Sequence, residues 1–169
     1  MNQGNKVLKI DHEKCTGCRL CELVCSVRHH HVSNPAKSRI RVIKWEADGV
    51  YVPISCQQCE DAPCATACPA KALARNADQG RVEVDYDRCI GCKICMSVCP
   101  FGAMRWNTAE RKVIKCDLCD GDPQCVRFCE MKAVDYVDAA KVGTARGREA
   151  AERVLDANRK GATLQSAGT

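Results

Sequence analysis

Cysteines are the side chains in this sequence that could do chemistry. The chain has 169 residues, of which 16 are cysteines, and they fall into four groups of four with none left over. We call these groups quartets one to four: Cys15, Cys18, Cys21 and Cys25; Cys56, Cys59, Cys64 and Cys68; Cys89, Cys92, Cys95 and Cys99; and Cys116, Cys119, Cys125 and Cys129. Thiols can bind soft metals or form disulfides, so the spacing within each quartet has to discriminate between the two.

The spacing favours iron–sulfur clusters. Quartets one and three have the pattern C-x2-C-x2-C-x3-C, quartet two C-x2-C-x4-C-x3-C, and quartet four C-x2-C-x5-C-x3-C. Three thiolates on one tight loop can hold one face of a 4Fe–4S cube, while the fourth points away to the other cluster of a pair. Structural zinc needs two C-x2-C pairs per site and does not explain the third cysteine. Disulfides do not suit cysteines packed three residues apart in a chain without an export signal.

The remaining composition indicates that the clusters organise the fold. Aromatic residues make up only 4% of the chain, which is too few large rings for an ordinary core. We therefore expect the clusters to act as the core and the metal-free chain to be unfolded or molten. The formal net charge of +5 counts every cysteine as neutral. Four oxidised clusters with their thiolates would add about −8 and leave about −3, so the charge does not indicate nucleic-acid binding.

The sequence contains an internal repeat in the order A-B-A-B, where A stands for the segments of quartets one and three and B for those of quartets two and four. The segment Ile10–Cys21 matches Val84–Cys95, and Ile54–Cys59 matches Ile114–Cys119. Alternating apolar and polar residues predict strands, turn residues predict hairpins, and short helices are expected near the trailing cysteines. These are strands at 7–11, 82–86 and 113–115, hairpins at 39–54 and 104–115, and helices at 21–27 and 95–99. The prediction is an α+β fold of tandem two-cluster, ferredoxin-like units.

Few other residues are candidates for chemistry. The sequence has no Ser/His/Asp arrangement, no Walker loop and no dinucleotide fingerprint, and we interpret Glu60 and Asp61 as solvated surface. The triplet His29–His31 could bind a metal or accept a proton coupled to a cluster. Adjacent histidines cannot all face one ion, so a solvated loop or a partner contact is the favoured interpretation. We therefore predict no catalytic residues and a chain that is not an enzyme by itself.

The quartets, in this order and with longer second and fourth loops, resemble the four-cluster electron-transfer subunits of multi-subunit oxidoreductases. The resemblance runs from Val7 to about Val137. Within that group, the segment PISCQQCEDAPCATACP is most similar to the electron-transfer subunit of tungsten aldehyde oxidoreductases, of the aldehyde ferredoxin oxidoreductase type. This implies a tungstopterin catalytic subunit as partner and, in some cases, a flavin subunit.

Other roles remain open at this point. The chain could be the electron carrier of carbon monoxide dehydrogenase, of a hydrogenase or of another molybdopterin enzyme. It could diffuse freely as a polyferredoxin that serves several enzymes. It could also be a scaffold or filament-forming assembly protein in which the clusters are structural.

The resemblance also implies how the cysteines are shared between clusters. In the family, quartets one and four exchange their fourth ligands, and so do quartets two and three. Carried over by position, the ligand sets, which we call sites 1 to 4, are Cys15, Cys18, Cys21 and Cys129; Cys25, Cys116, Cys119 and Cys125; Cys56, Cys59, Cys64 and Cys99; and Cys68, Cys89, Cys92 and Cys95. Pro69 and Pro100 follow the fourth cysteine only in quartets two and three, which agrees with this pairing. No ligand is replaced, so four 4Fe–4S clusters are expected.

These predictions divide the chain into a tandem ferredoxin-like domain at 1–137 and a C-terminal helical extension and tail at 138–169. In the extension, Arg146–Lys160 has helix formers and a thin apolar stripe. These features predict a helix that docks on a partner subunit or on a second copy of the chain. The alternative is a frayed tail. The sequence has no run of about 18 apolar residues, so we predict no membrane span. Met1–Asp11 has no apolar signal region, so we expect a cytoplasmic protein.

Overall fold

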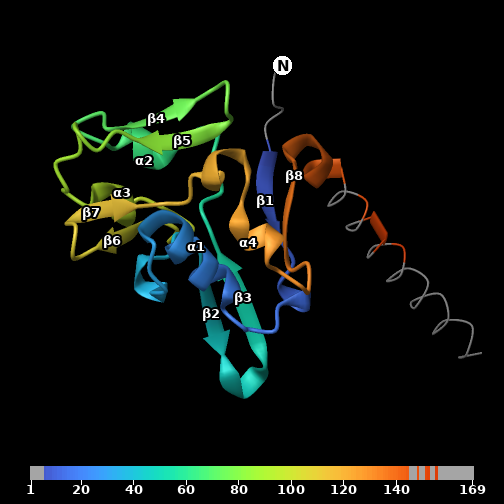
Figure 1. The fold of residues 1–169 in the computed structure, drawn as a ribbon. Coiled ribbons are helices and arrows are strands. Elements are labelled where there is room, and N and C mark those ends of the chain that lie inside the picture. Colours follow the sequence, from blue (N-terminus) through green and yellow to red (C-terminus); the bar gives the residue numbers. More distant parts are fainter. Residues whose placement is uncertain (1–5, 145–147, 149–150, 153–154, 156–169) are drawn as a thin grey trace, which may run out of the picture.

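Short strands and helices separated by cysteine-bearing loops make up the fold (Figure 1). In this computed structural model, residues 6–144, 148, 151–152 and 155 are described. The labelled helices are α1 (Leu20–His30), α2 (Pro63–Thr66), α3 (Ile94–Ser97) and α4 (Gln124–Arg127), and residues 139–144 are helical as well. The strands are β1 (Lys6–Ile10), β2 (Arg41–Trp45), β3 (Val50–Ile54), β4 (Leu73–Asn76), β5 (Arg81–Val84), β6 (Arg105–Asn107), β7 (Lys112–Ile114) and β8 (Val134–Asp138). The finding agrees with the predicted mixture of helices and strands.

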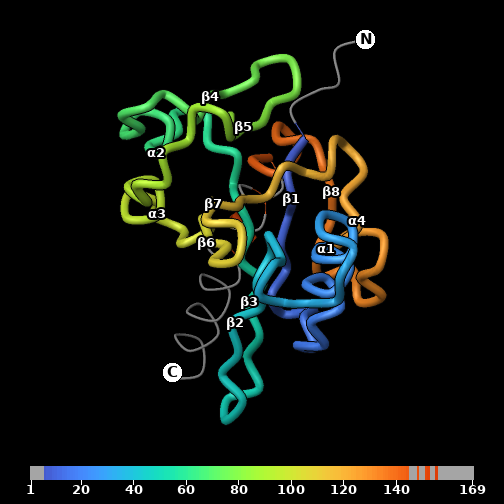
Figure 2. The backbone as a smooth tube through the Cα atoms, turned by 60° about the vertical axis from the view of Figure 1, so that its left-hand side comes forward, coloured from blue at the N-terminus to red at the C-terminus, as the bar shows by residue number. Residues whose placement is uncertain are grey.

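Two antiparallel strand pairs bring the quartets together. Strand β1 precedes quartet one and pairs with β8, which follows quartet four, with Lys6 opposite Asp138 and Ile10 opposite Val134. Strand β4 follows quartet two and pairs with β5, which precedes quartet three. Because each sheet joins the ends of two cysteine-bearing segments, the outer quartets lie together and the inner quartets lie together (Figure 2).

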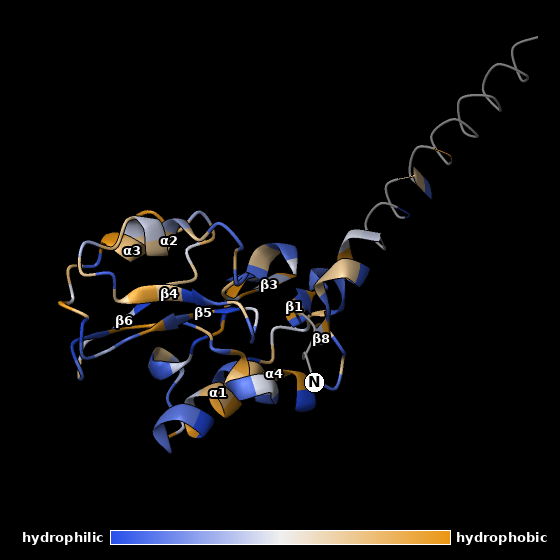
Figure 3. Ribbon diagram, turned by 90° about the horizontal axis from the view of Figure 1, so that it is seen from above, coloured by the Kyte–Doolittle hydropathy of each residue, from blue (hydrophilic) through white to orange (hydrophobic). Residues whose placement is uncertain are grey.

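Helix packing follows the same division. Helix α1 packs against α4, and α2 packs against α3. Buried residues form one cluster around Leu8, Ile40, Leu118 and Val134, and a second around Leu73, Val82, Met104 and Val113. Each cluster includes cysteines from two quartets. In Figure 3, apolar residues occur in short segments of several elements, which agrees with two small cores.

The internal repeat is visible in the backbone conformation. Equivalent residues of the two halves adopt the same left-handed conformation without being glycine: Arg19 (φ 61°) and Lys93 (φ 64°), Gln58 (φ 51°) and Leu118 (φ 60°), and Lys71 (φ 48°) and Lys132 (φ 51°). Such residues are strained and persist only where the surrounding structure demands them. The repeat in the sequence therefore reflects the same bends in both halves.

Both predicted hairpins are confirmed. Strands β2 and β3 pair from Arg41 opposite Ile54 to Trp45 opposite Val50, and β6 pairs with β7. Gly49, in the turn between β2 and β3, has a φ of +65°. The sequence did not predict β4 or β8, because neither shows a regular alternation of apolar and polar residues.

The C-terminal extension falls mostly beyond the part of the chain that the structure describes. The predicted helix Arg146–Lys160 lies outside the described residues except for Arg148, Ala151, Glu152 and Leu155. Among the helices that are described, none is both long enough and apolar enough to cross a membrane.

An aromatic ring packs directly on the loop of quartet one. A Cβ added at Gly17 (φ +69°) would lie 2.6 Å from Cδ1 of Tyr51, on strand β3. At the equivalent Gly91 (φ +70°), the added Cβ would lie 3.3 Å from Cη2 of Trp106, on strand β6. Both loops therefore need glycine for the backbone conformation and for the close approach of a ring.

We predict that Gly17→Ala weakens the protein more than Gly49→Ala. Both positions have positive φ, but an added methyl group meets nothing within 4 Å at Gly49, so only the change at Gly17 adds a clash with a ring. Overpacking of this kind costs about 1–3 kcal/mol beyond the shared backbone strain. The measurement is the rate at which cluster absorbance is lost in guanidinium. Equal rates for the two variants would contradict the close approach of Tyr51.

Candidate iron–sulfur cluster sites

Three of the four expected ligand sets each line a pocket. Cys15, Cys18, Cys21 and Cys129 line a pocket of about 220 Å³, together with Phe128 and Met131. The set Cys56, Cys59, Cys64 and Cys99 lines a second pocket, and the set Cys68, Cys89, Cys92 and Cys95 lines a third. In each pocket, three thiols come from one quartet and the fourth comes from the paired quartet.

The fourth set, Cys25, Cys116, Cys119 and Cys125, is buried throughout. Each of these side chains is 6–7% exposed, and three of them belong to the cluster of buried residues around Leu118. Burial first, and then the neighbouring Cys116, Cys25 and Cys119, raise the pKa of the Cys125 thiol. These four thiols are therefore neighbours, although they come from opposite ends of the cysteine-bearing part of the chain.

The donor sets fit 4Fe–4S clusters. Each set offers four soft sulfur donors, all 16 cysteines are free thiols, and no disulfide competes for them. We propose that sites 1 to 4 bind one cluster each, and each cluster would supply a one-electron redox couple. If paired quartets exchange their fourth ligands, each site must combine three thiols of one quartet with one thiol of the other, as found here. The binding of iron by these cysteines stays a prediction.

Burial keeps the metal-free thiols protonated. Desolvation, and then nearby thiolates, raise the pKa of Cys95 to about 11. Burial is also the main reason why the pKa of Cys21 rises to about 12, as does that of Cys116. Iron must therefore displace protons from these three thiols when it binds.

Backbone N–H groups already point at several sulfurs. Arg39 donates to Sγ of Cys25 at 3.3 Å, Ala72 to Sγ of Cys68 at 3.3 Å, and Leu118 to Sγ of Cys116 at 3.4 Å. Such bonds stabilise negative charge on a ligating sulfur and help to set the electronic properties of the metal centre.

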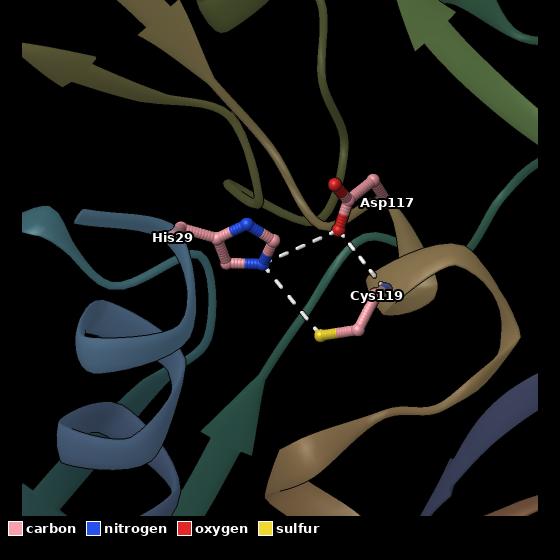
Figure 4. A group of neighbouring side chains, drawn as sticks. All are labelled: His29, Asp117 and Cys119. Atoms are coloured by element: carbon pink, nitrogen blue, oxygen red, sulfur yellow. Dashed lines mark hydrogen bonds and ion pairs between the residues drawn. The ribbon is translucent and has the colours of Figure 1, made fainter. Parts of the chain in front are cut away.

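One histidine contacts a site 2 cysteine (Figure 4). Nε2 of His29 lies 3.6 Å from Sγ of Cys119 and 3.4 Å from a carboxylate oxygen of Asp117, whose other oxygen binds the Arg39 guanidinium. His29, Asp117 and Cys119 could together hold a metal ion. Because Cys119 belongs to the buried four-thiol set, we assign His29 to the surroundings of site 2.

The favoured interpretation of the histidine triplet was a solvated loop or a partner contact; the solvated loop is wrong for His29 and His30, and the partner contact stays a prediction. His29 and His30 lie in the last turn of α1, each with a side chain 10% exposed, and His30 pairs with Glu110 at 3.1 Å. No proline or glycine stops the helix earlier, and it ends where His31 adopts the left-handed conformation (φ 53°). Glu60 and Asp61 are exposed, as expected.

Comparison with known proteins supports the same class. Free thiols gathered in fours within a small α+β fold define a ferredoxin-like iron–sulfur protein. The 4Fe-4S dicluster domain family matches residues 47–139, and the 4Fe-4S binding domain family matches residues 8–28. This chain belongs to the 4Fe-4S dicluster family of ferredoxin-like electron-transport proteins, and it binds multiple 4Fe–4S clusters.

Relatives carry names from electron transport. YsaA of Escherichia coli (strain K12), named as an electron transport protein, is 43% identical over 86% of this chain and 98% of its own length. The polyferredoxin-like subunit of aliphatic sulfonate oxidoreductase from Pyrococcus furiosus is 44% identical over 69% of this chain and 67% of its own. The electron transport protein HydN of Escherichia coli (strain K12) is 38% identical over 82% of this chain and 91% of its own. The chain is therefore similar to iron–sulfur electron-transport proteins, and these relatives are named as carriers or subunits rather than as catalytic chains.

Double variants test the exchange of ligands. If Cys25 serves site 2, replacing Cys25 and Cys116 together with alanine removes one cluster and leaves about 12 iron atoms per chain. Replacing Cys25 and Cys15 together then disrupts two clusters and leaves about 8. Iron and sulfide analysis of anaerobically purified protein distinguishes the two results, with the single variants as controls. About 8 iron atoms in the variant at Cys25 and Cys116, and about 12 in the variant at Cys25 and Cys15, would show that each quartet holds its own cluster.

Proposed function

We propose that this chain is the electron-transfer subunit of a multi-subunit oxidoreductase and carries single electrons through four 4Fe–4S clusters. The observation that carries the proposal is the placement of the cysteines. Every cysteine belongs to one of four sets of neighbouring thiols, and none is left for another role. The relatives named for electron transport support the same function.

The burial of the cysteines suggests where electrons enter and leave. Sites 1 and 4 each contain one exposed cysteine, Cys18 and Cys92, whereas all four cysteines of site 2 are buried. Short distances to a partner are available only at exposed clusters. Sites 1 and 4 are therefore the proposed contacts with redox partners, and sites 2 and 3 connect them.

For the catalytic partner, we propose a tungstopterin oxidoreductase of the aldehyde-oxidising type, with a flavin subunit as a further redox partner. The similarity of the quartet-two segment to such electron-transfer subunits supports this assignment. The relative from Pyrococcus furiosus is itself a subunit of an oxidoreductase, which supports a separate catalytic chain. A carrier for carbon monoxide dehydrogenase, a hydrogenase or a molybdopterin enzyme is the alternative.

We predict about 16 iron and 16 sulfide per chain after anaerobic purification, since each site completes one cubane. Reduced viologen should transfer electrons to the isolated protein reversibly, yet the protein alone should turn over no aldehyde, carbon monoxide or hydrogen. Stoichiometric zinc with little iron would refute the cluster assignment. Clusters that cannot be reduced reversibly would favour the structural scaffold instead.

Purification of the native complex identifies the partner. If the proposal is right, a pterin-containing chain and tungsten co-purify with this subunit. Nickel, or molybdenum without tungsten, in the complex would point to one of the alternative partners.

A further inference from the structure

Lys115 is a buried cation placed between two cluster sites. It follows β7 and directly precedes Cys116, and it is 3% exposed. Its Nζ donates to the carbonyl of Cys116 at 2.7 Å, to Oε1 of Gln58 at 3.3 Å and to the carbonyl of Val82. An ammonium has three N–H donors, one for each of these acceptors, whereas a neutral amine has only two. The three acceptors match the three donors of a charged lysine.

Gln58 joins Lys115 to the loops of both sites. It lies between Cys56 and Cys59 of site 3, and its Nε2 donates to the carbonyl of Cys116, a site 2 cysteine, at 2.8 Å. Its Oε1 also accepts from the backbone N–H of Val82 at 2.9 Å. Gln58 is 3% exposed, so this network lies in the interior, where the two small cores meet.

Carboxylates near Lys115 are engaged by other cations. A cleft of about 250 Å³ beside it is lined also by Arg39, Arg81, Glu83 and Asp117. Arg39 pairs with Asp117, and Arg81 pairs with Glu83. Within the described part of the chain, no carboxylate forms an ion pair with Lys115.

A buried cation without a carboxylate is costly unless another negative group offsets it. Iron–sulfur clusters with their thiolates carry negative charge, and they would lie on both sides of this lysine. Val82, whose carbonyl accepts from Lys115, lines the pocket of the site 3 cysteines, and Cys116, whose carbonyl also accepts from Lys115, belongs to site 2.

We propose that Lys115 is a positioning residue for electron transfer, whose fixed charge raises the reduction potentials of the clusters at sites 2 and 3. Reduction adds one negative charge to a cluster, and a nearby cation in a low-dielectric interior stabilises the reduced form more than the oxidised form. The two inner clusters would then accept electrons more readily than they would beside a neutral residue. This inference rests on the ligand sets proposed above.

The test compares Lys115→Met with Lys112→Met, which removes the same charge from an exposed position three residues away. Iron content and four one-electron steps in the unaltered protein establish the proposed sites independently. Potentiometric titration followed by electron paramagnetic resonance then gives the potentials of each variant. In Lys115→Met, we expect two of the four steps to shift down, with the ratio of reduced to oxidised cluster at a fixed potential falling at least tenfold, or 59 mV. Lys112→Met should shift none.

Two further variants separate charge from packing. Lys115→Arg keeps the positive charge and should retain the unaltered potentials. Gln58→Glu places a carboxylate beside the ammonium without changing the number of heavy atoms, and it should lower the same two potentials. If Lys115→Met loses iron, Gln58→Glu decides the question. Four unchanged potentials in Lys115→Met or in Gln58→Glu would overturn the inference, whereas fewer than four steps in the unaltered protein would overturn the proposed sites instead.

Discussion

Four thiols must converge at each site from two distant parts of the chain, and the rest of the structure serves that convergence. Cys129 reaches the pocket of Cys15, Cys18 and Cys21 because strand β8, which follows it closely, pairs with β1, which precedes Cys15. The pairing of β4 with β5 does the same for the inner quartets. With the proposed ligand sets, neither half of such a pair completes its sites alone, so metal binding and folding would be coupled across the whole cysteine-bearing region.

Burial of these thiols leaves little space for an ordinary apolar core. It also means that buried polar and charged groups need partners in the interior. The apolar residues form two small clusters, and cysteines contribute to both. Buried polar side chains connect them. Glu22 is fully buried, accepts from the backbone N–H of Val42 at 2.7 Å and pairs with Arg19, which ties α1 to strand β2. Lys115 and Gln58 connect the two cores in a comparable way. The low dielectric constant of the interior strengthens each of these contacts. For the same reason, a buried polar group that loses its partner destabilises the fold.

The cysteine sites differ in how far they are exposed to solvent, and this difference suits electron transfer. The loops of quartets one and three each leave their second cysteine exposed, while Tyr51 and Trp106 pack on the glycines beside it. Site 2 is enclosed, with His29 and the Arg39–Asp117 pair at its edge. A carrier needs accessible ends and a protected interior, because solvent around a cluster changes its potential and its stability.

The sequence by itself determined the cysteine quartets, the A-B-A-B repeat and the two hairpins, because ligand spacing, turn residues and alternation are local signals. The left-handed backbone shared by Gln58 and Leu118 shows that the repeat is structural as well. Only the tertiary structure decided that β1 pairs with β8, that His29 reaches Cys119, and that Lys115 meets Gln58 and Val82. These contacts join residues far apart in the chain, and they depend on how the two small cores pack together, which no local periodicity encodes.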